Sequence, residues 1–458
     1  MQPKEKWIIN GTVVTQDSER RVLRANIRLV DGRIVDITTK QPKGRSLSAK
    51  VIDARGLTIL PGFVQAHIHL CQTLFRNQAD DLELMDWLAK RIWVMEAAHD
   101  EETLNTSALL GIHELLSSGT TCILDMGTVR HTEAVFDAVK TSGIRANVGK
   151  CLMDHPKRTP PGLREPTHVA LREAKDLYSK WNGAEGGRIR ASYAPRFVIS
   201  CTEELMREVA RLSSEQCAVV HTHASESRKE IEMVRKFAGC ANVEYLRRLG
   251  LTTDQLVLAH GIWLDKRELE ILRKSGTSVV HCPSSNMKLA SGFAQVPEMR
   301  KLGINVALGA DGAPCNNNLN AFQEMRLAAL IHKPRGGPRT MRAREVLDMA
   351  TRDGARALKW FDEIGSIEKG KKADLVAIDL MCPENTLPAP AAAARHPDLD
   401  AIASSIVYSS QPSHVRWTMV EGRLVYRGGI VRTIDTAQLM ARVYRAQLAI
   451  AARVKKRR

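Results

Sequence analysis

The stretch ILPGFVQAHIH, residues 59–69, decides the fold of this chain. Its first half is an apolar run that predicts a buried strand, and its end places His67 and His69 two positions apart. On an extended strand such residues point to the same face, so both imidazoles can bind one metal ion from a single strand end. Two unrelated histidines would show the same spacing, so the rest of the chain has to decide between these interpretations.

Similar apolar runs recur along the next 250 residues. They lie near residues 59–66, 120–125, 145–152, 188–194, 217–222, 255–259, 277–281 and 304–309, which makes eight candidate strands. Helical patterns separate several of them, at 203–213, 229–249 and 266–274, and another follows at 342–358. Strands that alternate with helices indicate a parallel sheet, and eight such units indicate an α/β chain with a (β/α)8 TIM-type barrel over residues 59–363.

The two ends of the chain are rich in strands without intervening helices. Residues 1–58 contain two β-rich runs around Asp31-Gly32, a dipeptide typical of a two-residue hairpin turn. Residues 364–458 add further strands, a loop at 384–400 rich in Pro and Ala, and a helix from about 435 to 452. Neither end has enough strands for a sandwich alone, so we expect both to build one small β-sandwich domain.

Composition indicates an ordinary soluble globular protein of 458 residues, with 44% hydrophobic and 26% charged residues. No apolar run reaches the roughly 18–20 residues of a membrane span, and no signal peptide is evident. Nine cysteines without CxxC pairs favour reduced thiols and a cytoplasmic location. The net charge of +16 is spread along the chain apart from the cluster at 455–458, so we expect no nucleic-acid or membrane partner.

The candidate chemical groups gather at the ends of the predicted strands, where a barrel places its active site. Five of the eight strands end in such groups: His67 and His69, then His221, His223 and Glu226, then His260, then His281, and finally Asp311. Three neutral imidazoles and a carboxylate suit Zn²⁺ or Fe²⁺, with a position left for a water whose pKa the metal lowers. Glu226 can then move protons, and His260 can orient the hydroxide.

Each of these residues also has an ordinary structural interpretation. We expect His221 to be packed or hydrogen-bonded, and His281 to lie outside the direct ligands. Glu226 alone can cap the next helix, and Asp311 alone can be a turn residue. For the whole set, however, that interpretation requires several independent coincidences at strand ends.

Six ordered motifs resemble the amidohydrolase superfamily, in its branch of chlorohydrolases and aminohydrolases. They are PGFVQAHIH (61–69), HASE (223–226), AHG (259–261), HCPSSNMKL (281–289), LGADG (308–312) and GSIEKGKKADL (365–375). The resemblance covers nearly the whole chain. It implies one divalent metal, Zn²⁺ or alternatively Fe²⁺, with His67, His69, His223 and Asp311 as ligands and with Glu226, His260 and Asp311 as catalytic residues. The strand-4 end, Tyr193-Ala194-Pro195-Arg196, shows no lysine to carboxylate, which disfavours a two-metal site.

Two further resemblances concern the substrate, and they conflict. DWL (86–88) and WVME (93–96) resemble methylthioadenosine and S-adenosylhomocysteine deaminases, in which the residue matching Glu96 binds ribose hydroxyls and the one matching Trp87 lines the pocket. Without this resemblance Glu96 would be read as a solvated surface carboxylate. The triplet Pro195-Arg196-Phe197 instead resembles guanine deaminases, in which the arginine contacts the purine.

We therefore expect a hydrolytic deaminase of an aminopurine-type ring, acting on an adenosine-derived nucleoside such as 5′-deoxyadenosine, methylthioadenosine or S-adenosylhomocysteine. The alternatives are a guanine, oxo-purine or pterin deaminase and an s-triazine amino- or chlorohydrolase. A non-enzymatic descendant would be expected to have lost ligands, and none is missing here. The resemblance also implies a homo-oligomer.

Overall fold

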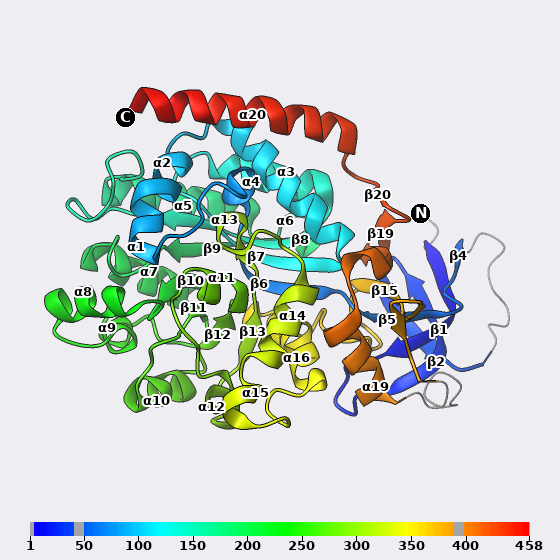
Figure 1. The fold of residues 1–458 in the computed structure, drawn as a ribbon. Helices are drawn as coiled ribbons and strands as arrows, with labels where there is room; N and C mark the ends of the chain where they lie inside the picture. Colours follow the sequence, from blue (N-terminus) through cyan, green and yellow to red (C-terminus); the bar gives the residue numbers. More distant parts are fainter. Residues whose placement is uncertain (1–3, 41–49, 389–397, 458) are drawn as a thin grey trace. The chain divides into compact units, whose positions relative to one another are not determined.

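The computed structural model describes residues 4–40, 50–388 and 398–457 (Figure 1). The chain divides into two compact units. The β unit comprises residues 1–65, 113–122 and 320–433, and the barrel unit comprises residues 66–112, 123–319 and 434–458. The predicted loop at 384–400 and the basic cluster at 455–458 lie partly outside the described residues.

The barrel sheet contains every strand that the sequence predicts for it. Its strands are β6 (Phe63–His69), β7 (Thr120–Thr128), β8 (Arg145–Leu152), β9 (Ile189–Pro195), β10 (Val220–Ala224), β11 (Leu256–His260), β12 (Ser278–His281), β13 (Val306–Leu308) and β14 (Asp311–Gly312). They are hydrogen-bonded in sequence order from β6 to β13, and β14 pairs with β6 in parallel. Because β13 and β14 are pieces of one run separated by two residues, the sheet closes on itself as a TIM-type barrel.

The strand register brings the functional residues to one rim of this barrel. His223 lies opposite Ala259 on β11, and His260 lies opposite Ala224 on β10. On the other side of the barrel, Asp311 lies opposite Ile68 of β6. All three are at the carboxyl ends of their strands, as the sequence predicts for an active site.

Most barrel strands are followed by helices that cover the outside of the sheet (Figure 1). These are α3 (Glu101–Ser117), α4 (Thr132–Ser142), α5 (Thr167–Trp181), α6 (Ala184–Gly187), α7 (Glu203–Gln216), α8 (Arg228–Ala238), α9 (Asn242–Arg248), α10 (Lys266–Ser275), α11 (Pro283–Lys288) and α12 (Val296–Lys301). In α7 the Thr202 side chain caps the first turn, and Leu205, Val209 and Leu212 are buried. The single helix predicted over 229–249 is instead two, because Gly239 adopts a left-handed conformation with φ of 65° and ends α8.

A run of short elements follows β6 and forms part of the rim. It comprises η1 (Leu70–Phe75), α1 (Leu84–Trp87), η2 (Leu88–Ile92) and α2 (Trp93–Glu96), and α13 (Ala313–Asn316) follows β14. The long helix α20 (Thr436–Arg457) lies alongside α2 (Figure 1). Gln447 donates to the Leu74 carbonyl at 3.3 Å, and Arg453 pairs with Asp100. No helix among the described residues is long and apolar enough to cross a membrane.

The β unit is built on one sheet that takes strands from both ends of the chain. The order is β20 (Ile430–Val431), β19 (Arg423–Arg427), β18 (Val415–Val420), β15 (Leu375–Asp379), β5 (Leu57–Pro61), β1 (Glu5–Val14), β2 (Val22–Val30) and β3 (Arg33–Thr38), and β4 (Lys50–Asp53) pairs with β1. The predicted turn at Asp31-Gly32 is confirmed, since φ is 47° and 81° at its two residues. Ile8, Ile27 and Ile59 are fully buried in the core of this sheet.

Helices and short strands complete the β unit. They are α14 (Ala321–Leu330), α15 (Lys333–Gly336), α16 (Ala343–Met349), α17 (Arg352–Ala357), β16 (Met381–Cys382), β17 (Asn385–Thr386), α19 (Leu399–Ser404), η3 (Ser405–Ser409) and η4 (Pro412–His414). The helix predicted over 342–358 is two short helices, α16 and α17.

Candidate active site

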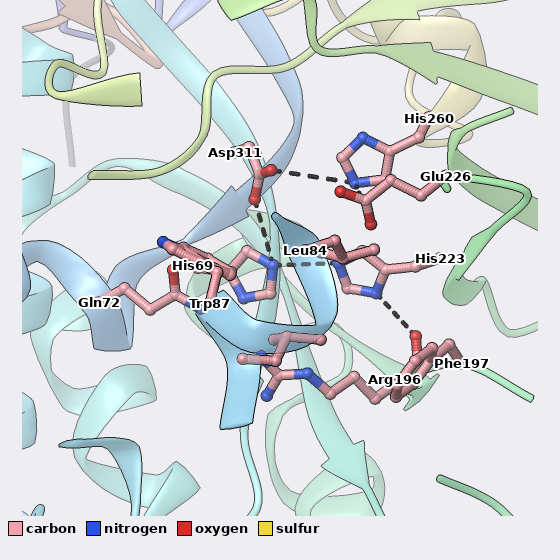
Figure 2. A pocket seen from close by; sticks show the side chains of 11 residues that line it. His69, Gln72, Leu84, Trp87, Arg196, Phe197, His223, Glu226, His260 and Asp311 are labelled. Atoms are coloured by element: carbon pink, nitrogen blue, oxygen red, sulfur yellow. Dashed lines mark hydrogen bonds and ion pairs between the residues drawn. The ribbon is translucent and has the colours of Figure 1, made fainter. Parts of the chain in front are cut away.

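The predicted metal ligands meet at the rim of the barrel, and Figure 2 shows three of them, His69, His223 and Asp311. His69 Nε2 lies 3.2 Å from His223 Nε2 and 3.4 Å from Asp311 Oδ1. His67 Nε2 lies 3.3 Å from the same Asp311 oxygen. The side chains of His67, His69 and Asp311 are buried, and that of His223 is partly buried.

Hydrogen bonds behind the imidazoles direct their free nitrogens toward one point. His223 Nδ1 lies 2.7 Å from the Arg196 carbonyl, which can only accept, so Nδ1 carries the proton and Nε2 keeps its lone pair. His67 Nδ1 lies 2.8 Å from His221 Nε2, which leaves His67 Nε2 facing Asp311. His67 Nε2 has no hydrogen-bond partner among the described residues. The sequence predicts a packed or hydrogen-bonded His221, and the structure places it in a hydrogen bond with His67, a predicted ligand.

This donor set fits a divalent metal ion. Tetrahedral coordination with bonds of about 2.0–2.1 Å separates the ligand atoms by about 3.3–3.4 Å, close to the distances between these side chains. Burial lowers the pKa of His67, and it lowers the pKa values of His69 and His223 well below the usual range, so their imidazoles are neutral. Burial opposes ionisation of Asp311, but the surrounding imidazoles, first of all His67, hold its pKa well below the usual range. Neutral imidazoles and a carboxylate are the protonation states that a metal requires.

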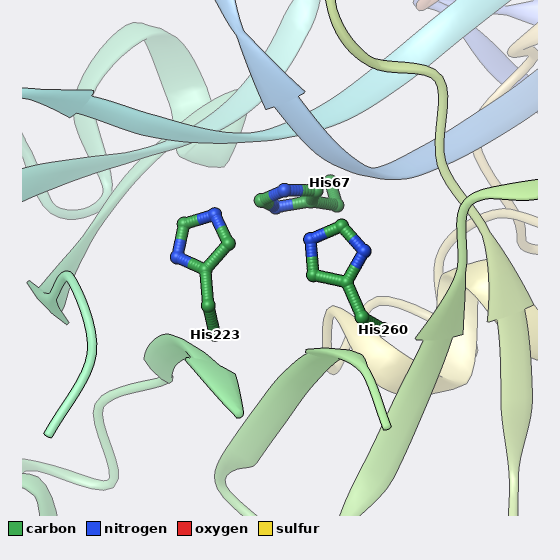
Figure 3. A group of neighbouring side chains, drawn as sticks. All are labelled: His67, His223 and His260. Atoms are coloured by element: carbon green, nitrogen blue, oxygen red, sulfur yellow. The ribbon is translucent and has the colours of Figure 1, made fainter. Parts of the chain in front are cut away.

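Glu226 and His260 lie beside this donor set. His260 Nε2 is 3.5 Å from Glu226 Oε2 and 3.9 Å from Asp311 Oδ2, and Figure 3 shows its ring beside those of His67 and His223. His260 Nδ1 lies 2.8 Å from the Asn286 amide oxygen, which directs Nε2 into the site. Burial, followed by the charges of Asp311 and Glu230, raises the pKa of Glu226 well above its usual value. A carboxyl group with a raised pKa is suited to carry a proton near neutral pH.

The backbone is strained at two residues of this site. His260 and Asp311 have φ values of 72° and 62°, in the left-handed region that non-glycine residues rarely adopt. Such conformations cost about 1–3 kcal/mol each and concentrate at functional sites. Ser285 donates to Asp311 Oδ2 at 2.6 Å, which fixes the second oxygen of that carboxylate. Ser285 and Asn286 belong to the motif at 281–289, but the sequence assigned them no role.

A pocket opens above the donor set. Besides residues of the donor set it is lined by Gln72, Leu84, Trp87, Leu88, Arg196 and Phe197 (Figure 2). Two of the three predicted substrate-binding residues, Trp87 and Arg196, are thus in its wall. The Trp87 indole nitrogen is buried without a hydrogen-bond partner among the described residues.

The third predicted substrate-binding residue, Glu96, lies behind this wall. Its carboxylate accepts two hydrogen bonds from Arg196, at 2.6 and 3.2 Å, and one from Gln72 Nε2 at 2.8 Å. The two residues that gave conflicting indications of the substrate are therefore partners. Sequence reasoning missed Gln72, although a polar residue three positions after His69 at a strand end was available as a signal. His281 is buried at the end of β12. Among the described residues, it does not belong to any cluster of side chains that could hold a metal ion.

Comparison with known proteins agrees with this geometry. The profile of the amidohydrolase family matches residues 58–425. The chain is 35% identical to a 5′-deoxyadenosine deaminase of Methanosarcina mazei over 98% of each chain. It is 36% identical to a 5-methylthioadenosine/S-adenosylhomocysteine deaminase of Moorella thermoacetica, over 86% of this chain and 87% of that one. The crystal structure of an adenosine deaminase from Xanthomonas campestris with bound zinc superimposes with a TM-score of 0.89 at 30% identity, covering 98% of this chain and 99% of the other.

A closed barrel with this donor set at its rim defines a metal-dependent hydrolase. The chain belongs to the amidohydrolase family.

Proposed function

We propose that the protein is a metal-dependent hydrolytic deaminase of an adenosine-derived nucleoside: 5′-deoxyadenosine, methylthioadenosine or S-adenosylhomocysteine. The observation that carries the proposal is the convergence of three imidazoles and one carboxylate beside Glu226 and His260. Deaminases of adenosine-type nucleosides among the relatives support the choice of substrate.

The proposed metal ligands are His67, His69, His223 and Asp311, holding one ion per chain. We favour Zn²⁺, because the adenosine deaminase with the same fold contains zinc, and Fe²⁺ is the alternative. When bound, the ion lowers the pKa of a water so that hydroxide is available near neutral pH.

Three side chains then move protons or orient the attacking oxygen. Glu226 accepts one proton of the attacking water and donates it to the ring nitrogen of the substrate. Asp311 accepts the other proton and passes it to the amino group, which leaves as ammonia. His260, held by Asn286, directs Nε2 toward the attacking oxygen.

The pocket wall supplies recognition of the purine. Trp87 offers an apolar face and an indole N–H without an acceptor, and Arg196 offers hydrogen-bond donors. Glu96 supports this wall through its hydrogen bonds to Arg196 and Gln72, although the resemblance assigns the matching residue of the relatives to the ribose. The position of Arg196 and Phe197 in the wall also favours a second candidate, deamination of guanine or another oxo-purine or pterin; s-triazines are a third.

A substrate panel tests these proposals. Metal-replete protein is incubated with 5′-deoxyadenosine, methylthioadenosine, S-adenosylhomocysteine, guanine, pterins and triazines, and ammonia is measured. We expect the nucleosides to be turned over with the highest kcat/KM. Turnover of guanine alone would replace the first candidate by the second.

We also propose that the enzyme is a cytoplasmic homo-oligomer without nucleic-acid or membrane partners. On α20, Met440, Tyr444 and Leu448 form an exposed apolar stripe that a second copy can cover. Light scattering of the wild-type protein and of an M440S/L448S variant tests this. We expect the wild type to be an oligomer and the variant to be a monomer. A monomeric wild type would contradict the proposal.

A further inference from the structure

The Glu96 carboxylate is held by two residues of the pocket wall. Arg196 donates from Nη1 to Oε2 at 2.6 Å and from Nη2 to Oε1 at 3.2 Å, and Gln72 Nε2 donates to Oε1 at 2.8 Å. All three side chains are buried, with residue exposures of 7% for Glu96, 4% for Arg196 and 0% for Gln72. Arg196 and Gln72 line the pocket, whereas Glu96 does not.

Hydrogen bonding leaves Glu96 little capacity for a ligand. A carboxylate has about four acceptor positions; Arg196 and Gln72 occupy three of them, and the Cys71 thiol donates to Oε1 at 3.9 Å as well. If Glu96 were to bind ribose hydroxyls with both oxygens, it would have to release Arg196 or Gln72. Releasing a buried, bidentate arginine leaves two unpaired charges, which is strongly unfavourable.

The same carboxylate fixes the orientation of the Gln72 amide. Because Glu96 can only accept, Gln72 must present its Nε2 to Glu96 and turn its Oε1 the other way. Gln72 Oε1 is buried and has no hydrogen-bond partner among the described residues. It lies close to Gly312, where an added Cβ would be 2.0 Å away. Glu96 therefore decides which end of the Gln72 amide faces Gly312, and it fixes this side chain of the pocket wall.

We propose that Glu96 is a positioning residue: it holds Arg196 as a donor against the substrate's heterocycle and fixes the Gln72 amide beside it, and it does not itself contact the ribose. This inference rests on the proposed nucleoside deaminase function and deepens it. The ion pair also makes the wall electrically neutral, which suits an uncharged ring.

Two substrates distinguish this role from ribose binding: 5′-deoxyadenosine and its analogue without the 2′ and 3′ hydroxyls. If Glu96 acts through Arg196 and Gln72, E96Q lowers kcat/KM for both substrates by the same factor, about 10- to 100-fold. R196M gives a similar loss, and E96Q/R196M is no worse than R196M, because both variants disrupt one unit. A loss confined to 5′-deoxyadenosine, so that E96Q no longer prefers it to the analogue, would overturn the inference.

Thermal unfolding of the same variants tests the pair without any substrate. We expect E96Q/R196M to lose less Tm than the sum of the losses in E96Q and in R196M, since the double variant leaves no buried charge unpaired. E102Q, at an exposed glutamate of α3, is the matched control and should leave Tm and activity unchanged. Additive losses in Tm would contradict the pairing. A wild-type protein that deaminates no nucleoside would refute the proposed function instead, and the substrate comparison would then use the ring that the panel identifies.

Discussion

Replacing Glu226 by Gln removes the proposed proton carrier and little else. The amide has nearly the same shape as the carboxyl group, so packing against His260, 3.5 Å away, is retained. The backbone N–H of residue 226 remains bonded to Glu230 at 2.7 Å. General acid–base catalysis contributes about 10²–10⁴-fold in rate, which corresponds to about 3–5 kcal/mol of transition-state stabilisation. We therefore expect kcat to fall by that factor while KM changes little.

The assay is steady-state ammonia release from 5′-deoxyadenosine by metal-replete E226Q, with metal content measured on the same sample. E232Q, at an exposed position of α8, is the matched control and should retain wild-type kcat. If E226Q keeps its metal and full kcat, Glu226 is not the proton carrier. If it loses the metal, Glu226 acts on the metal site, and the assignment of roles at the rim is wrong.

Three further predictions concern residues around the site. H221A should weaken metal binding about 10- to 100-fold in a chelator competition, because His221 is hydrogen-bonded to His67 at 2.8 Å. H221Q should restore part of this affinity. If H221A and the wild type bind the metal equally well, His221 does not orient His67. Burial lowers the pKa of His99 from 6.5 to about 4, so the unfolded chain binds this proton more readily than the folded one, and folding stability should fall by about 3 kcal/mol as pH drops from 6.5 to 4. Urea unfolding of H99Q should show a flatter pH profile, and an unchanged profile would contradict the assignment. G127A should destabilise the protein by about 2–4 kcal/mol in urea unfolding. Gly127 has a φ of 71°, and an added Cβ would lie 1.7 Å from the Gly149 carbonyl oxygen. A loss below about 1 kcal/mol would mean that the backbone adapts.

The barrel and the rim position of the candidate ligands could be predicted because both depend on local sequence. Each strand is an apolar run with a polar residue at its end, and a parallel barrel brings all such ends to one rim. That placement also left His221, His260 and His281 as candidates, and the family resemblance selected His67, His69, His223 and Asp311, whose donor atoms lie close together in the structure.

The pairing of Glu96 with Arg196 behind the pocket wall could not be predicted, since the two residues come from distant and irregular segments. Glu96 and Arg196 are 100 residues apart, one at the end of a run of short helices and the other just after β9. No periodicity encodes that pairing, so each residue seemed to indicate a different substrate. The prediction of one helix over 229–249 was wrong for a local reason, since the left-handed Gly239 ends the first of two helices there.

Ammonia release from 5′-deoxyadenosine before and after metal removal tests the central claim most directly. The metal-replete protein should release one ammonia for each nucleoside consumed, lose this activity when a chelator removes about one ion per chain, and regain it on addition of Zn²⁺. Undiminished turnover by metal-free protein, or no ammonia from any nucleoside at full metal occupancy, would contradict the account.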